Sequence, residues 1–278
     1  MTVAVVTDSA AALPAELVER QGITVVPMWL TIDGVAIREG ERKLGELLGD
    51  ARVTTSAPTP GEFAVAIREC FEDGADAVLV LTIASAMSAS HHAATVAARE
   101  EGENVRVVDT MTAAGGQALV VLAAAQRAAA GGSLDEVADA ASDVARRVRL
   151  VASVPDLAHL VRSGRVPGVA GWAGRTLGIS PLFEFRAGKV RRLRPALGID
   201  SALDRIVSRF RRAAEPGSRP HLVALHALAP DAADALLARA VADTDPVESF
   251  VSEFGSVMVV HAGPGIVGLA WWWDPNQE

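Results

Sequence analysis

A buried-strand pattern followed by a serine-rich loop constrains this chain more than any other feature. Residues Ala77–Leu81 form an unbroken apolar run, which is typical of a strand buried on both faces of a parallel sheet. A loop containing Ser85, Ser88 and Ser90 follows, and an alanine-rich helical pattern begins at Ala93. Backbone N–H groups and hydroxyls converge at such a junction, so the sequence predicts an anion site here. The alternative is that Ser90 only caps the helix.

The order of elements predicts an α/β protein with two domains. Over residues 1–149, apolar strands alternate with helical patterns, which favours an α/β/α domain with a mainly parallel sheet. Further on, Leu182–Arg186 and Lys189–Leu193 flank Ala187-Gly188 as an antiparallel hairpin among helices. We therefore expect a second α/β domain, with a mixed sheet, over residues 150–278.

Local signals predict several smaller features. Thr59, Pro60 and Glu62 have the spacing of a capping box at the start of a helix. Residues Ile23–Ile32 are interpreted as one strand region, and Gly171–Gly178 as a helix. The segment from Ser256 to Val260 is too short to assign.

Composition and charge argue against several classes of protein. The net charge is -8, whereas a nucleic-acid binder normally carries a basic face. Cys70 is the single cysteine, so no internal disulfide can form. The N-terminus lacks a basic region before an apolar segment, and Ala118–Ala130 is too short to span a bilayer. We expect a cytoplasmic protein with no transmembrane segment.

The sequence indicates neither a metal site nor a catalytic motif. His91 and His92 are adjacent, so on a helix their side chains diverge by about 100° and cannot chelate one ion. No P-loop, G-x-S-x-G elbow or dinucleotide fingerprint occurs. We therefore predict no catalytic residues, no metal and no cofactor.

Hydroxyl groups are concentrated in a second segment, Val53–Pro60. The capping box uses Thr59 and leaves the preceding hydroxyls without a structural role. Together with the serine loop they form a possible uncharged anion site, because hydrogen bonds to an ionised oxygen are about twice as strong as neutral ones. His261, beside flexible glycines, either adds a donor or is only structural. The candidate ligand-binding residues are Thr55, Ser56, Ser88, Ala89 and His261, with the Ser90 N–H beside them.

The ordered set of motifs resembles the DegV family of bacterial fatty-acid-binding proteins. The matching segments cover nearly the whole chain, and their order and spacing are more specific than any one of them. In chain order they are Thr7-Asp8-Ser9, Thr54-Thr55-Ser56-Ala57-Pro58, Ser85-Ala86-Met87-Ser88, Val108-Asp109-Thr110, Leu160–Val166, Pro181-Leu182 and His261–Gly268.

The resemblance implies two α/β domains with a buried acyl chain, and a fatty-acid carboxylate held by Thr55 and Ser88. Ser56 and Thr54 are close alternatives to Thr55, and His261 is implied near the head group. The resemblance also implies a partner, the ATP-binding subunit of a fatty acid kinase, which phosphorylates the bound acid. Arg165 would face that kinase.

The chain departs from the family pattern, and two rival functions remain open. Ala57 replaces the usual glutamine, Ala89 replaces a glycine, and His91-His92 is unfamiliar. One rival is a dihydroxyacetone-kinase-like substrate-binding domain. The other is a serine hydrolase using Ser88 and His261.

Overall fold

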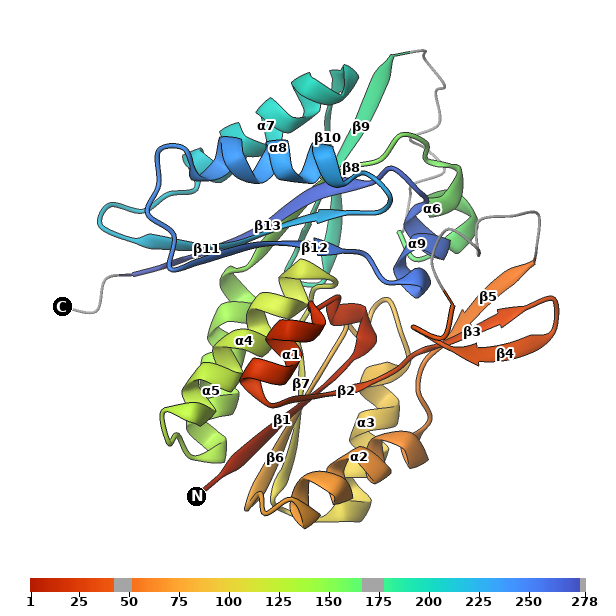
Figure 1. Cartoon of the computed structure of the whole chain (residues 1–278), viewed down its shortest axis with the longest axis vertical. Helices are drawn as coiled ribbons and strands as arrows, with labels where there is room; N and C mark the ends of the chain where they lie inside the picture. The colour runs from red at the N-terminus through yellow and green to blue at the C-terminus, as the bar shows by residue number, and fades with distance from the viewer. Residues whose placement is uncertain (43–51, 167–177, 276–278) are drawn as a thin grey trace.

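The computed structural model describes residues 1–42, 52–166 and 178–275, and three sheets organise them (Figure 1). The first sheet is entirely parallel, in the order β2 (Ile23–Val26), β1 (Val3–Asp8), β6 (Ala77–Thr82), β7 (Val105–Asp109). A small antiparallel sheet has the order β4 (Val35–Arg38), β3 (Trp29–Ile32), β5 (Val53–Ser56).

The third sheet is mixed and is built from the second half of the chain. Its order is β10 (Lys189–Leu197), β9 (Ile179–Arg186), β8 (Arg149–Ser153), β13 (Val267–Asp274), β11 (Arg219–His226), β12 (Glu248–Glu253). Only β11 and β12 are parallel neighbours; the other pairs are antiparallel. The predicted fold class, a mainly parallel N-terminal sheet and a mixed C-terminal sheet, is confirmed.

Helices separate and cover these sheets in layers (Figure 1). One face of the parallel sheet packs on α2 (Pro60–Glu72) and α3 (Ser90–Glu101), and the outer face of the mixed sheet packs on α7 (Gly198–Arg212) and α8 (Pro230–Val241). Between the two sheets lie α4 (Gly115–Ala129) and α5 (Leu134–Arg147). The remaining helices are η1 (Ser9–Ala11), α1 (Ala15–Gln21), α6 (Ala158–Ser163) and α9 (Ser256–Ala262).

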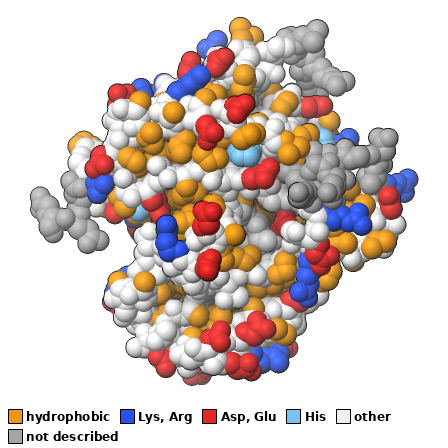
Figure 2. Space-filling view, viewed as in Figure 1, with side chains coloured by type: hydrophobic (Ala, Val, Ile, Leu, Met, Phe, Trp, Pro, Cys, Tyr) orange, Lys and Arg blue, Asp and Glu red, His pale blue; other side chains and the backbone are white. Residues whose placement is uncertain are grey.

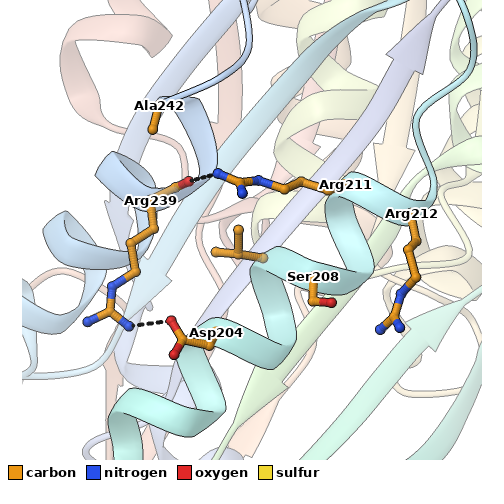
Figure 3. A pocket seen from close by; sticks show the side chains of 7 residues that line it. Asp204, Ser208, Arg211, Arg212, Arg239 and Ala242 are labelled. Carbon is orange, nitrogen blue, oxygen red and sulfur yellow. Dashed lines mark hydrogen bonds and ion pairs between the residues drawn. The ribbon is translucent and has the colours of Figure 1, made fainter.

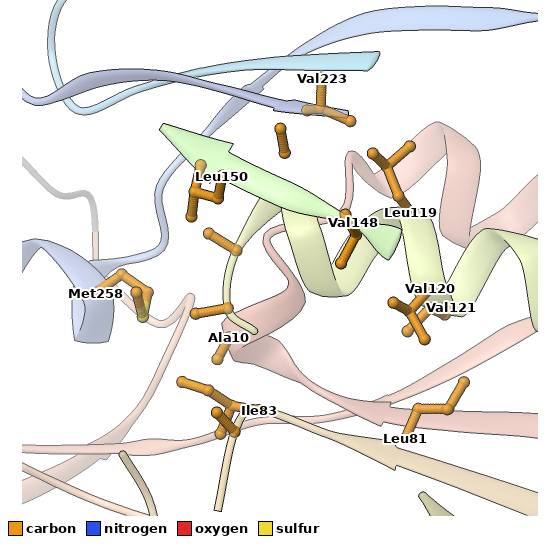
Figure 4. Close-up of a cluster of buried hydrophobic side chains, with 14 of the residues drawn as sticks. Ala10, Leu81, Ile83, Leu119, Val120, Val121, Val148, Leu150, Val223 and Met258 are labelled. Carbon is orange, nitrogen blue, oxygen red and sulfur yellow. The ribbon is translucent and has the colours of Figure 1, made fainter. Parts of the chain in front are cut away.

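Helix α4 joins the two sheets through one apolar cluster. Its sequence is apolar nearly all round, and its side chains lie between Leu81 of β6 and Val223 of β11 (Figure 4). A helix with this pattern must be buried on all sides, which the position between two sheets provides. The expected domain boundary between residues 149 and 150 stays a prediction, because this apolar cluster contains residues from both sides of it.

Several local predictions can be compared with the structure. The capping box of Thr59 and Glu62 is confirmed at the start of α2. The single strand region Ile23–Ile32 is wrong: β2 and β3 belong to different sheets and are separated by Pro27 and Met28. Proline has no N–H to donate to a neighbouring strand, which favours an interruption of the strand there. The unassigned segment near Ser256 is α9, whereas the predicted helix Gly171–Gly178 falls almost wholly outside the described residues.

Within the described ranges, no helix is both long enough and apolar enough to cross a membrane. On the face shown in Figure 2, acidic and basic side chains are interspersed, with no continuous basic surface.

Replacing Leu119, a fully buried residue of α4, by alanine should lower the free energy of unfolding by about 2–5 kcal/mol, because it leaves a cavity in the core. Since α4 contacts both sheets, urea unfolding should still show one transition. Val65→Ala, at an exposed position of α2, is the control and should change this free energy by less than about 0.5 kcal/mol. Two transitions, with only one shifted, would contradict the bridging role of α4.

Candidate functional site

The strand period of β5 separates the three clustered hydroxyls. Strand β5 pairs with β3 so that Thr55 lies opposite the buried Leu30. Alternate side chains of a strand point to opposite faces, so Thr54 and Ser56 share the other face. Thr54 and Ser56 are exposed, whereas Thr55 is half-buried. Thr55 is therefore the hydroxyl of this segment that faces the protein.

Thr55 forms a hydrogen bond with His261, 206 positions away in sequence. Oγ1 of Thr55 lies 2.7 Å from Nε2 of His261, in the last turn of α9. Burial, together with the positive charge of Arg165, lowers the pKa of His261 to about 4. The imidazole is thus neutral at pH 7. If Nε2 carries its proton it donates to Thr55, whose own O–H is then free for an anion.

A buried carboxylate holds the N-terminal end of α9. The Val257 N–H donates to Oε1 of Glu39 at 2.7 Å, and the Ser9 hydroxyl donates to Oε2 of the same residue. Burial raises the pKa of Glu39, while these two hydrogen bonds oppose that shift. A Cβ at Gly255 would lie 2.5 Å from Oε1, so glycine is needed for this approach. Ser9 thereby fixes the helix that carries His261.

Two glycines after His261 let the chain pack against the segment leading to Arg165. Gly263 and Gly265 have φ of 86° and 78°, in the left-handed region that favours glycine. A Cβ at these positions would meet the His159 ring at 2.8 Å and Pro155 at 2.7 Å. The His261–Gly268 and Leu160–Val166 motifs are therefore neighbours in space.

Arg165 lies at the surface beside this junction. Its side chain is exposed, and its Nη1 donates to the Ser163 carbonyl at 2.7 Å. Its charge contributes to the lowered pKa of His261, so the two side chains interact electrostatically. A protonated His261 would be repelled by Arg165.

In the second loop, Ser88 is paired with Ser90. The two Oγ atoms are 2.9 Å apart, and the Ser90 N–H donates to Ser88 Oγ at 3.2 Å. Ser90 is the buried first residue of α3, and Ala89 occupies the N-cap position without a side-chain hydrogen bond. The interpretation of Ser90 as a simple helix cap is wrong, because Ser88 accepts the N–H of this first turn. The Ala89 N–H has no hydrogen-bond partner in the described part of the chain.

The serine loop is anchored at its beginning by two carboxylates. The Ile83 N–H donates to Oδ2 of Asp8 at 3.0 Å. Both the N–H and the hydroxyl of Ser85 donate to Asp109, at 3.2 and 2.5 Å. Backbone N–H groups that donate to carboxylate oxygens in this way fix the path of the loop.

Asp8 was not among the candidate residues, although it holds the start of the serine loop. It also caps η1 by accepting the Ala10 N–H. It is also fully buried, and Gln117 Nε2 donates to its Oδ1 at 2.9 Å. Desolvation raises the pKa of Asp8 to about 6, against hydrogen bonds from Gln117, Ile83, Ala10 and Ser90. No spacing signal connects these segments, which lie far apart in the sequence.

The structure thus forms two hydrogen-bonded pairs, Thr55 with His261 and Ser88 with Ser90. No hydrogen bond joins the two pairs within the ranges that the structure describes. The segments that carry the two pairs contribute to one apolar cluster, through Ile83 of the serine loop and Met258 of α9 (Figure 4).

Two grooves differ in their position relative to these residues: the first lies beside Asp8, and the second contains none of the candidate residues. A groove of about 470 Å³ is lined by Asp8, Ser9, Glu39 and Glu253, on the side where η1 meets β12. A groove of about 620 Å³ between α7 and α8 contains none of the candidate residues (Figure 3). In this groove Arg239 forms an ion pair with Asp204, with Nη1 and Oδ1 2.9 Å apart. Over the described residues, no group of three or more His, Cys, Asp or Glu side chains could hold a metal ion.

Comparison with known proteins identifies the family. The family model described as uncharacterised protein, DegV family, matches residues 2–273. The chain belongs to the DegV family. A DegV domain-containing protein of Streptomyces coelicolor is 38% identical over 275 residues, covering 96% of this chain and 97% of that protein. One from Mycobacterium tuberculosis is 35% identical over 272 residues, covering 97% and 96%.

Solved DegV structures share the fold. One, described as showing fatty acid binding of a DegV family protein from Thermus thermophilus, has a TM-score of 0.92 and 32% identity, covering 99% of this chain and 100% of that one. A DegV lipid-binding protein from Thermotoga maritima has a TM-score of 0.89 and 25% identity, with complete coverage of both chains, 100% and 100%.

Replacing His261 by glutamine should make the stability less sensitive to acid. The folded-state pKa of His261 is lowered, so its protonation favours unfolding as the pH falls from 6.5 towards 4, and there is no such effect above 6.5. Between pH 7 and pH 5, the free energy of unfolding measured in urea should fall less for the variant than for the parent. His92→Gln, at an exposed position, is the control. Equal losses in parent and His261→Gln would contradict the burial of a neutral imidazole.

Proposed function

We propose that this protein binds a long-chain fatty acid and holds its carboxylate with the hydroxyls of Ser88 and Thr55. The observation that supports this most directly is the Thr55–His261 hydrogen bond at 2.7 Å. A neutral His261 that donates from Nε2 leaves the Thr55 proton for the ligand. Ser88 supplies the second hydroxyl, and the Ala89 N–H is available beside it.

The acyl chain would lie against the apolar cluster. This cluster collects side chains from the serine loop, α6, α9 and both large sheets, among them Met87, Leu160, Met258 and Phe183. Each buried CH₂ contributes about 0.8 kcal/mol, so the tail would supply most of the affinity. The hydroxyls would then decide where the head group lies.

The relatives support the same ligand class. The Thermus thermophilus structure is described as showing fatty acid binding, and a Thermotoga maritima relative, 26% identical, is named a fatty acid-binding protein. In this proposal Ser56 lies at the rim, since its side chain is exposed on the opposite face from Thr55.

We further propose that the bound acid is presented to a separate ATP-dependent kinase subunit, which forms the acyl phosphate. Arg165 is exposed next to the α6–α9 junction and interacts with His261, so it can contact a partner near the head group. Residues 1–149 would carry the carboxylate loops, and residues 150–278 would complete the acyl pocket.

The rival functions are less well supported by the geometry. A serine hydrolase needs a hydrogen bond between Ser88 and His261. Within the described ranges, Ser88 is bonded to Ser90 and His261 to Thr55. A dihydroxyacetone-kinase-like site needs a histidine free to attack a carbonyl, whereas Nε2 of His261 is engaged by Thr55.

Ser88→Ala should weaken binding of a C16 acid by about ten- to a hundredfold, the loss of a charge-assisted hydrogen bond of roughly 1.5–3 kcal/mol. Thr55→Val should weaken binding to a similar extent. The double variant should lose less binding free energy than the two single variants added together, because both hydroxyls hold one carboxylate. Affinity for the C16 alcohol, measured by the same fluorescence titration, should change little.

Thr54→Val is the matched control for Thr55→Val, since the exposed Thr54 lies on the opposite face. A loss of acid affinity in Thr54→Val but not in Thr55→Val would move the site to the other face. If the parent bound the alcohol as tightly as the acid, a carboxylate site would be ruled out.

Arg165→Ala should lower acyl-phosphate formation by the kinase about tenfold, the effect of removing one interface arginine. Affinity for the fatty acid should stay unchanged, because Arg165 is exposed. Arg162→Ala, an exposed arginine on α6, is the control. Equal turnover by Arg165→Ala and the parent would remove Arg165 from the kinase contact.

A further inference from the structure

Positive charge is concentrated on one side of α7, where this helix packs on β10. Strand β10 carries four basic residues and no acidic one. Helix α7 carries four arginines, and its two aspartates, Asp200 and Asp204, both pair with Arg239 of α8. The side of α7 that faces β10 therefore lacks the acidic groups of this helix. The whole chain has a net charge of -8, so composition alone does not explain this local excess of positive charge.

A groove of about 390 Å³ lies on this side, between α7 and the strands of the mixed sheet. Its floor is apolar, with one residue each from β8, β9 and β10, namely Val151, Leu182 and Leu193. Its polar lining consists of Ser208 and four arginines, Arg194, Arg205, Arg209 and Arg212. The three arginines of α7 are separated by four and three positions, so they share one face of the helix. None of the described residues that line this groove is acidic.

Two of the four arginines are held in place by hydrogen bonds. Arg205 and Arg209 are half-buried. Nη1 of Arg205 donates to the Arg194 carbonyl at 3.1 Å, and Nη2 of Arg209 donates to Oε2 of Glu184 at 3.0 Å. A guanidinium has five N–H donors in a rigid fork, so each of these two arginines keeps further donors for a ligand.

The other two arginines have no partner for their charge. Arg194 and Arg212 are exposed, and in the part of the chain that the structure describes no hydrogen bond or ion pair engages either guanidinium. The adjacent Arg211 differs, because its Nη2 donates to the Arg239 carbonyl at 3.0 Å and pairs with Asp243 at 2.7 Å. Figure 3 shows Arg211 reaching towards Arg239, and Arg212 on the opposite side of α7.

We propose that this groove binds a small organic phosphate, with the phosphate group between the arginines and the apolar part of the ligand on Leu182 and Leu193. Arginine can hold two phosphate oxygens with two parallel N–H donors, and it keeps its charge at any pH at which proteins are folded. The apolar floor favours an organic phosphate over the inorganic ion, which would have no apolar surface to bury. The groove contains none of the residues of the proposed fatty-acid site, so this inference does not rest on the proposed function.

Titration calorimetry of the unaltered protein with three probes tests the class of ligand. At pH 8, hexyl phosphate carries close to two negative charges and hexyl sulfate carries one on the same tail, so the phosphate should bind about tenfold more tightly. Inorganic phosphate, which lacks the tail, should also bind about tenfold more weakly than hexyl phosphate. The proposal is wrong if hexyl phosphate shows no saturable binding at millimolar concentrations, or if either of the other probes binds as tightly.

Arg212→Gln should weaken binding of hexyl phosphate about tenfold, because it removes a guanidinium that has no partner within the protein. Arg211→Gln is the matched control. It removes the same charge from the adjacent position, where the guanidinium is paired on the side of α8, and should change the affinity by less than about twofold. Equal losses in the two variants would show attraction to general positive charge and would contradict a site in the groove.

A further comparison separates this groove from the fatty-acid site. Ser88→Ala should leave the affinity for hexyl phosphate unchanged, and Arg212→Gln should leave the affinity for the C16 acid unchanged. If Ser88→Ala lost hexyl phosphate and Arg212→Gln kept it, the phosphate would lie at the serine loop and the proposal would be overturned. Failure of the parent to bind the C16 acid would refute only the proposed function.

Discussion

Burial of the Asp8 carboxylate is the constraint on which the site depends. A buried carboxylate is strongly unfavourable unless it accepts several hydrogen bonds. Asp8 obtains them from η1, the loop after β6 and α4, so these segments must meet at the end of β1. Its neighbour Ser9 donates to Glu39, which holds α9. Two adjacent residues thereby connect the serine loop with the helix that carries His261.

The proposed site would use neutral donors although the chain has 26 Lys and Arg residues. A lysine inside the apolar cluster would need a partner when no ligand is bound, because an unpaired buried charge is costly. Hydroxyls avoid this cost, since Thr55 bonds His261 and Ser88 bonds Ser90 within the protein. In the proposed function such a site would orient the carboxylate and leave most of the affinity to the tail.

Local patterns were enough to predict elements, and contacts between distant segments were not. The buried run of β6 and the capping box of α2 depend on residues within a few positions, so their signals are visible in the sequence. The Thr55–His261 bond joins segments 206 positions apart, and only the family resemblance brought both residues into the site. For Ser90 a local signal was misleading. Its position suits a helix cap, but Ala89 is the N-cap residue and the Ser90 hydroxyl lies 2.9 Å from that of Ser88.

The pKa values of Asp8 and His261 lie in the reverse of their usual order. Burial raises the pKa of Asp8 to about 6 and lowers that of His261 to about 4. Between these values neither of the two side chains carries a charge, so the burial of both costs least there. At neutral pH Asp8 is ionised, and the N–H donors of Ala10, Ile83 and Gln117 compensate its lost hydration. His261 stays neutral at that pH because its ring is buried and a proton on it would be repelled by the exposed Arg165, so the hydrogen bond to Thr55 is made by an uncharged imidazole.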